Sequence, residues 1–237
     1  MFEGIRMRSR GRRTEQGSDA LEIATLRKHI VAGSTVFDVG ANKGGYLAPL
    51  ADATGREGTV YGFEPIPALA LRLEKSVRQL RWNHVHIIQA AASDTDGTAR
   101  LTTPDGERHW ESSLEHIPGN SDHSFEVPTI RLDSMLPKIK DSNLTAIKID
   151  VEGHESAVIR GAGELIKQHR PFMLVEVEAR HRPDADPTVF FAEMEAQGYQ
   201  GWFTRDGNRH DLHDFDTARD QSNPEQYINN FAFTMKS

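Results

Sequence analysis

The chain has 237 residues, of which 37% are hydrophobic and 27% charged, and its formal net charge is −7. This composition is typical of a globular protein, and the length suits one domain with additions, since domains cluster at about 100–200 residues. Neither a cysteine nor a run of about 18 apolar residues is present, which excludes disulfides, thiolate metal sites, a cysteine nucleophile and a membrane-spanning helix.

The N-terminal stretch is basic. Residues 1–18 carry five arginines and two glutamates, a charge of +3, so the other 219 residues carry −10. We predict a flexible arm over 1–18 and a single domain over 19–237, because chain termini are often loose. The negative charge of residues 19–237 disfavours a nucleic-acid partner, because binding to phosphates needs clustered basic side chains. The arm also lacks an apolar signal core, which favours a cytoplasmic location.

Apolar runs alternate with segments of helical periodicity. The runs predict strands at 35–39, 59–63, 85–88, 145–149 and 172–175. One helix is predicted from the glycine-rich turn to Leu50, and a second over the segment in which Leu69, Leu73, Val77 and Leu80 recur at helical spacing. Two more are predicted over 154–169 and over 189–197. Strands separated by helices indicate an α/β fold with a mostly parallel sheet. The runs at 199–203 and 231–235 predict an antiparallel C-terminal hairpin. A polar insertion over about 94–143 contains short β-like pieces.

The turn that follows the first strand, Gly40–Gly45, is rich in glycine. A dinucleotide fingerprint would place glycine at position 42, where this chain has Asn42, and this disfavours NAD. The pattern suits S-adenosylmethionine, whose cationic amino group can face Asp38. Glu64 ends the second strand 24 residues beyond Gly40. A carboxylate there can accept hydrogen bonds from both ribose hydroxyls.

Several motifs together resemble the FkbM family of S-adenosylmethionine-dependent methyltransferases. They are Phe37–Gly44, Gly62–Pro65, Ala92–Asp94, Leu132–Asp133, Ile147–Glu155 and Glu176–Glu178. The resemblance covers about 37–178 and implies a class I, Rossmann-like methyltransferase that acts on hydroxyl groups of sugars, glycolipids or secondary metabolites. We predict cofactor contacts from the two turns and from the end of the third strand: Asp38, Gly40, Asn42, Gly44, Tyr46, Glu64, Pro65, Ala91 and Ala92.

The fourth strand carries the residues predicted to be catalytic. Lys148 and Asp150 are two apart on a strand, so they share one face, and Glu152 and His154 follow in the turn. Buried charges on a central strand are costly unless they are paired or functional. Asp150 and Glu152 are the preferred candidates for the base or for gripping the acceptor. His154 is a further candidate base, because the unperturbed imidazole of a histidine has a pKa of about 6.5, but the family tolerates other residues at that position.

Further residues are predicted to contact the acceptor. They are Trp110, Ser112 and Ser113 in the insertion, Glu176 and Glu178 at the end of the fifth strand, and His181, for which a satisfied surface histidine is the simpler interpretation. Glu176, Glu178 and Asp150 offer oxygen ligands for Mg²⁺, although we do not expect a metal to be required. The stretch 210–216 is expected to be a solvated acidic loop.

Several functions stay open at this point. The favoured one is O-methylation of a small-molecule or glycan acceptor. Methylation of nitrogen or of a carboxylate, and a non-catalytic cofactor-binding module, use the same scaffold, because a fold does not choose the acceptor atom. RNA methylation through the basic arm is disfavoured by the negative charge of residues 19–237. A homodimer is compatible with all of these functions.

Overall fold

The computed structural model describes residues 2–17, 19–103, 114, 123–139, 143–182, 186–224 and 226–236. Trp110, Ser112 and Ser113 lie outside the described residues. Within this part of the chain, no helix has the length and apolarity that a membrane crossing requires.

A sheet of eight strands forms the centre of the fold, in the order β10-β9-β11-β8-β7-β1-β2-β3. Its five parallel strands are the five predicted from apolar runs: β1 (Thr35–Val39), β2 (Thr59–Phe63), β3 (Val85–Ile88), β7 (Leu144–Ile149) and β8 (Phe172–Glu176). Because they are parallel, all five end at one edge of the sheet, where the polar residues of the sequence motifs lie.

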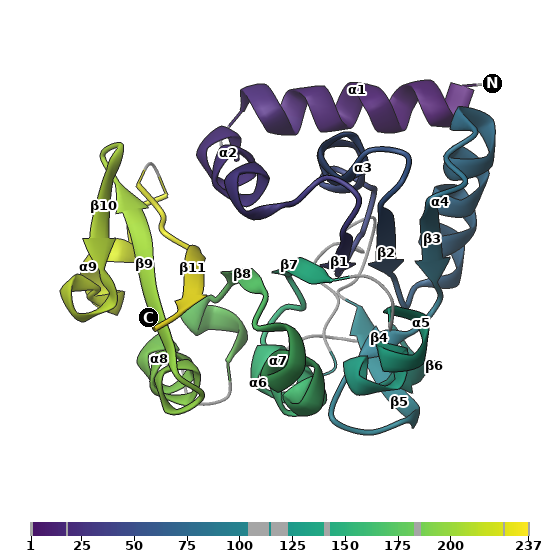
Figure 1. Cartoon of the computed structure of the whole chain (residues 1–237). Helices are drawn as coiled ribbons and strands as arrows, with labels where there is room; N and C mark the ends of the chain where they lie inside the picture. The colour runs from purple at the N-terminus through teal and green to yellow at the C-terminus, as the bar shows by residue number, and fades with distance from the viewer. Residues whose placement is uncertain are drawn as a thin grey trace.

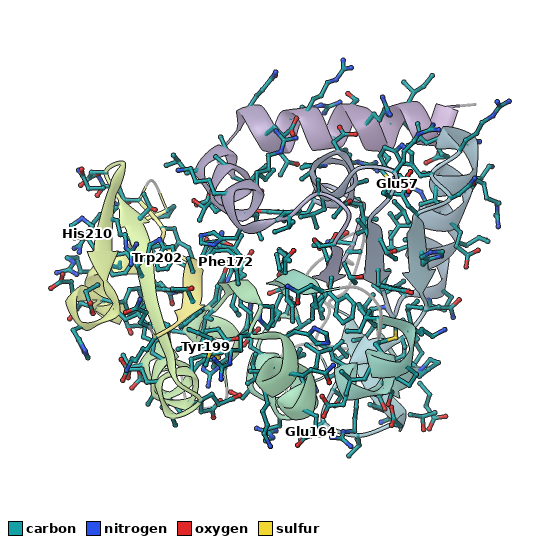
Figure 2. The ribbon with its side chains drawn as sticks, in the orientation of Figure 1. Glu57, Glu164, Phe172, Tyr199, Trp202 and His210 are labelled. Atoms are coloured by element: carbon teal, nitrogen blue, oxygen red, sulfur yellow. The ribbon has the colours of Figure 1, made fainter. Side chains whose placement is uncertain are left out.

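The C-terminal strands are antiparallel, as the sequence predicted. Strand β11 (Asn230–Met235) pairs with both β8 and β9 (Tyr199–Arg205) in antiparallel register. Strand β10 (Asn208–Asp211) extends this part of the sheet. The expectation of a loop over 210–216 is therefore wrong at its start, because residues 208–211 pair with β9 at the sheet edge. Phe172 and Trp202 lie near each other across this region, with ring centroids 5.9 Å apart (Figure 2).

Helices cover both faces of the sheet (Figure 1). One face carries α1 (Phe2–Gln16), α2 (Ala20–His29), α3 (Leu47–Thr54) and α4 (Pro67–Leu80), and the other carries α5 (Leu136–Ile139), α6 (Glu155–Arg160), α7 (Gly163–His169) and α8 (Pro187–Ala196). Alternate side chains of β1 serve the two cores, since Val36 packs under the first group and Phe37 and Val39 under the second. Short helices η3 (Ala179–His181), η4 (Leu212–Asp214) and α9 (Thr217–Asp220) complete the C-terminal half.

The polar insertion forms a small second sheet. Its order is β4-β6-β5, with β4 (Ala91–Ala92) parallel to β6 (His123–Ile130) and β5 (Gly97–Thr103) antiparallel to it. The helical segment η2 (Leu132–Met135) then leads into α5. This sheet places Ala91 and Leu101 beside Ile66 and Leu69 in a separate apolar cluster.

The N-terminal stretch differs from the predicted flexible arm. Residues 2–16 form α1, which lies along α3 and α4 (Figure 1). Met7 is 1% exposed, and an added Cβ on Gly11 would lie 2.6 Å from the Cβ of Ala48. The helix is held by this close apolar contact, which the arginines in its sequence obscure.

The predicted helix over 154–169 is present as two helices, α6 and α7, with a break at Gly161 and Ala162. Its predicted apolar face is confirmed, because Ala157, Val158, Ala162, Leu165 and Ile166 are all buried. The break follows from a close approach to the chain beyond β4. An added Cβ on Gly161 would lie only 1.9 Å from the carbonyl oxygen of Ser93.

Gly161→Ala is therefore expected to destabilise the fold by about 2–3 kcal/mol, because the methyl group must displace backbone in a packed region. The φ of Gly161 is −74°, which alanine adopts freely, so the effect would be steric. Gly163→Ala is the matched control, since nothing lies within 4 Å of its added Cβ. Urea unfolding of the three proteins measures the difference. Equal midpoints for Gly161→Ala and wild type would contradict the close approach.

Candidate active site

A cavity of about 450 Å³ lies at the carboxyl edge of the parallel strands. Ligands bind at this edge in open α/β sheets. Eleven of the predicted site residues line it: Gly40, Asn42, Glu64, Pro65, Ala91, Ala92, Asp150, Glu152, His154, Glu176 and Glu178. The sequence motifs therefore converge on one cavity.

Glu64 anchors the glycine-rich turn to the end of β2. Its carboxylate is 3% exposed and accepts hydrogen bonds from the backbone N–H groups of Asn42 (2.7 Å) and Ile66 (2.8 Å). Burial raises the pKa of Glu64 to about 7, although both N–H donors oppose the shift. A carboxylate accepts about four hydrogen bonds, so it can bind two hydroxyl groups of a ligand in addition to these donors.

The turn itself needs glycine at position 40. Gly40 has a φ of +84°, and an added Cβ would lie 1.8 Å from the carbonyl oxygen of Asp150. Asn42 also has a positive φ, of 47°. Gly44, with a φ of +79°, packs against Met7 and Leu73. It lines neither this cavity nor a smaller one that lies beside it. The backbone of the turn thus passes directly over the end of β7. Because the turn lies this close to the sheet, the neighbouring strand ends stay open to a ligand.

A second cavity, of about 270 Å³, lies beside the first and shares Gly40, Asn42 and Asp150 with it. Three predicted site residues, Asp38, Tyr46 and Lys148, line this second cavity and not the first. The remaining lining comes from the glycine turn and from the N-terminal region: Arg10, Arg13, Thr14, Asp19, Ala41, Lys43 and Gly45. The predicted cofactor residues are thus distributed over two adjoining cavities.

Lys148 is a buried cation that lines the second cavity. It is 2% exposed, its Nζ donates to Asp150 Oδ2 at 2.7 Å, and it lies 4.9 Å from the centre of the Tyr46 ring. Burial alone would lower the pKa of Lys148, but Asp150, Asp38 and Glu176 outweigh it and raise the pKa. One lysine therefore faces three carboxyl groups, an arrangement that attracts a further positive charge.

Asp38 is the least satisfied of these acids. It is 1% exposed, and neither of its carboxylate oxygens has a hydrogen-bond partner in the described part of the chain. Burial raises its pKa to about 6, while Lys148 opposes the shift. A buried acceptor without a partner is costly, so a donor on a ligand would relieve Asp38.

Glu152 is held in a strained conformation at the cavity wall. Its φ is +53°, in the left-handed region that non-glycine residues rarely adopt, and such strain concentrates at functional sites. Its carboxylate pairs with Nδ1 of His181. Burial raises the pKa of Glu152, and although burial alone would lower the pKa of His181, the hydrogen bond and charge of Glu152 raise it. His181 is thus satisfied by Glu152, as the simpler interpretation expected, but its side chain is only 13% exposed and lines neither cavity.

Glu176 and Glu178 form a hydrogen-bonded unit with the C-terminal segment. Asn229 Nδ2 donates to Glu176 Oε1 at 2.6 Å and to Glu178 Oε1 at 3.1 Å. Burial, followed by the charge of Asp150, raises the pKa of Glu176 well above its usual value. Burial alone would raise the pKa of Glu178, but hydrogen bonds from Asn229 and Arg180 lower it. The unit can hold a proton on Glu176 and a charge on Glu178.

Sequence reasoning missed several residues of the first cavity. Arg180, Tyr227 and Asn229 come from beyond the motifs, and they gave no recognisable spacing; the apolar wall comes from Ile66, Leu69, Leu101 and Leu114. His154 was predicted, and its Nε2 lies 2.9 Å from Ser93 Oγ. Within the described residues, no group of three or more histidine or acidic side chains is arranged to hold a metal ion.

Glu155, in the same motif, has a structural role. It is 1% exposed and accepts from the Gly153 N–H at 2.8 Å, and Arg182 Nη1 forms an ion pair with its Oε2 at 3.5 Å. Burial raises its pKa from 4.5 to about 7. Because the folded state binds this proton more tightly, the stability that Glu155 contributes is present below pH 4.5 and is lost as the pH rises towards 7.

We therefore expect wild type to lose about 2–4 kcal/mol of unfolding free energy, relative to Glu155→Gln, between pH 4.5 and pH 8. The glutamine keeps an acceptor for Gly153 but does not ionise. Denaturant unfolding at several pH values measures the difference. Glu126→Gln is the control, because Glu126 is exposed and its difference from wild type should not change with pH. A constant difference for Glu155→Gln as well would refute the raised pKa.

A family model and a curated relative match parts of the chain. The methyltransferase FkbM domain matches residues 38–200. A protein-L-isoaspartate O-methyltransferase from Caenorhabditis elegans is 39% identical over 69 residues, which are 27% of this chain and 31% of the relative. The match thus spans less than a third of that relative's length.

Solved structures are similar in fold. The methyltransferase FkbM from Methylobacillus flagellatus superposes with a TM-score of 0.52 at 17% identity, over 98% of this chain and 55% of that one. A SAM-dependent methyltransferase from Aquifex aeolicus gives a TM-score of 0.53 at 13% identity, over 99% of each chain. At these identities the likeness establishes the fold.

Proposed function

The chain belongs to the FkbM family of S-adenosylmethionine-dependent methyltransferases, and on this premise we propose that it methylates a hydroxyl group of a small molecule or glycan. The observation that carries the proposal is the set of carboxyl groups in the first cavity, which Glu152, Glu176 and Glu178 line together with Glu64. An ionised carboxylate only accepts hydrogen bonds, which suits a hydroxyl group as the donor.

The residues present fit S-adenosylmethionine. Glu64 would bind the ribose hydroxyls, and the apolar wall of Ile66, Leu69 and Leu101 would cover the adenine. Asp38, whose buried carboxylate oxygens have no hydrogen-bond partner among the described residues, would take the amino group. The three acids around Lys148 suit a cofactor with a positively charged sulfur, and they oppose the phosphates of a dinucleotide. When bound, S-adenosylmethionine supplies an electrophilic methyl group.

The chain's own residues would orient and deprotonate the acceptor. Asp150, held by Lys148, lies where both cavities meet and can grip the acceptor hydroxyl. Glu152, whose pKa is raised by burial, would accept the proton as the oxygen gains its methyl group, with His181 holding its carboxylate in place. Orientation contributes about 7–11 kcal/mol in such reactions, and a general base about 10²- to 10⁴-fold. This route uses no Mg²⁺, so a chelator should leave turnover unchanged.

An amine acceptor is the second candidate, because the same carboxylates attract a cation. The test is transfer of a radiolabelled methyl group to a panel of neutral sugars and polyols, aminosugars and simple amines. Label on hydroxyl oxygen of a neutral sugar supports the proposal. Label found only on nitrogen would show that the acceptor is an amine and overturn the proposed hydroxyl methylation. Label on neither class of compound would overturn both functions.

A further inference from the structure

We infer that Arg10 of the N-terminal helix binds the α-carboxylate of the cofactor in the second cavity. This inference rests on the proposed use of S-adenosylmethionine and extends it to a helix outside the matched residues 38–200. It assigns to α1 a ligand-binding role that its sequence, a basic stretch at the terminus, does not reveal.

The two cavities divide naturally between the two halves of such a ligand. The first contains Glu64 and an apolar wall, which suit a nucleoside, and the second adjoins it across Gly40, Asn42 and Asp150. A molecule that extends past the glycine turn from Glu64 enters the second cavity. Its amino-acid end would then lie between Asp38 on β1 and Arg10 on α1.

Charge in the second cavity matches a zwitterion. Asp38 supplies a buried carboxylate without a hydrogen-bond partner in the described residues, which suits an ammonium group. Arg10 and Arg13 supply guanidinium groups on the α1 side, and guanidinium binds carboxylate through paired hydrogen bonds. A ligand with one positive and one negative group is complementary to both sides.

Arg10 is the better placed of the two arginines. Its Nη1 donates to the carbonyl oxygen of Lys43 in the glycine turn at 3.2 Å, and the side chain is half-buried, whereas Arg13 is exposed. The helix that carries it is fixed on the turn, because an added Cβ on Gly44 would lie 2.9 Å from the sulfur of Met7, and one on Gly45 would lie 3.1 Å from the Thr14 hydroxyl. A group held in this way is pre-organised for a ligand.

Calorimetric titration with two ligands tests the inference. S-adenosylhomocysteine carries the amino-acid end, whereas 5′-methylthioadenosine has the same nucleoside and sulfur without it. Arg10→Ala is expected to bind S-adenosylhomocysteine about 10- to 100-fold more weakly, because it loses one charge-assisted pair between guanidinium and carboxylate. Its affinity for 5′-methylthioadenosine should stay within threefold of the wild-type affinity. Arg10→Lys should recover part of the loss, because it restores charge without the paired donors.

Arg12→Ala is the matched control, since Arg12 lies on the same helix and is exposed; it should bind both ligands as wild type does. Thermal melting of the ligand-free variants verifies that α1 stays folded. Equal weakening of both ligands by Arg10→Ala, or no weakening of either, would overturn the role of Arg10 while leaving the cofactor assignment intact. If wild type binds neither ligand, the proposed function fails and this inference fails with it.

Discussion

Glu64→Ala is expected to weaken binding of S-adenosylhomocysteine by about 100-fold or more, roughly 2.7 kcal/mol. The proposed contact is one carboxylate with two ribose hydroxyls, and a hydrogen bond to a charged group contributes about 1.5–3 kcal/mol. The same carboxylate fixes the turn through the N–H groups of Asn42 and Ile66, so its loss also frees the backbone that passes beneath the nucleoside. Calorimetric titration of wild type and variant measures the change.

Glu57→Ala is the control for this experiment. Glu57 precedes β2, as Glu64 follows it, but is exposed (Figure 2), and its removal should leave affinity within a factor of two. The Glu64 carboxyl also predicts a pH effect of known sign. Because burial raises its pKa to about 7 and hydroxyl donors favour the charged form, affinity should fall as the pH drops below 7. Retention of wild-type affinity in Glu64→Ala would remove the ribose assignment.

The features predicted correctly from sequence are those with a local cause. Strands such as 172–175 are continuous apolar runs because both faces of the parallel sheet are covered. Polar groups directly after such strands must share one edge of the sheet, and so Asp150 and Glu64, which are 86 positions apart in sequence, could be placed together. The importance of Gly40 could also be predicted, because a backbone rarely passes so close to a neighbouring strand unless the residue is glycine.

The features that sequence could not supply depend on contacts between distant segments. The packing of α1 depends on Met7 and Gly11, two residues that form no recognisable apolar pattern in a stretch dominated by arginine. The break between α6 and α7 depends on the Ser93 carbonyl, 68 positions away from Gly161. The partner of Glu152, His181, comes from a different strand end, and no spacing rule links the two.

Glu152→Gln is expected to lower the turnover of whichever acceptor is methylated by about 10²- to 10⁴-fold, the usual contribution of a general base. The glutamine has nearly the same shape but does not take a proton. Binding of S-adenosylhomocysteine should stay within threefold of wild type, since we assign Glu152 to the acceptor. Single-turnover rates at saturating cofactor, together with calorimetric titration, separate the two effects.

The pH profile distinguishes a base from a residue that only shapes the cavity. A base must be deprotonated, so wild-type turnover should fall as the pH drops below the raised pKa of Glu152, and this limb should disappear in the residual activity of Glu152→Gln. His181→Asn should shift the limb to higher pH, because it removes the partner that favours the charged carboxylate. Glu164→Gln, on the exposed side of α7 (Figure 2), should leave rate and profile unchanged. A normal rate for the Glu152→Gln enzyme would contradict this role and favour Asp150, which lines both cavities, as the base.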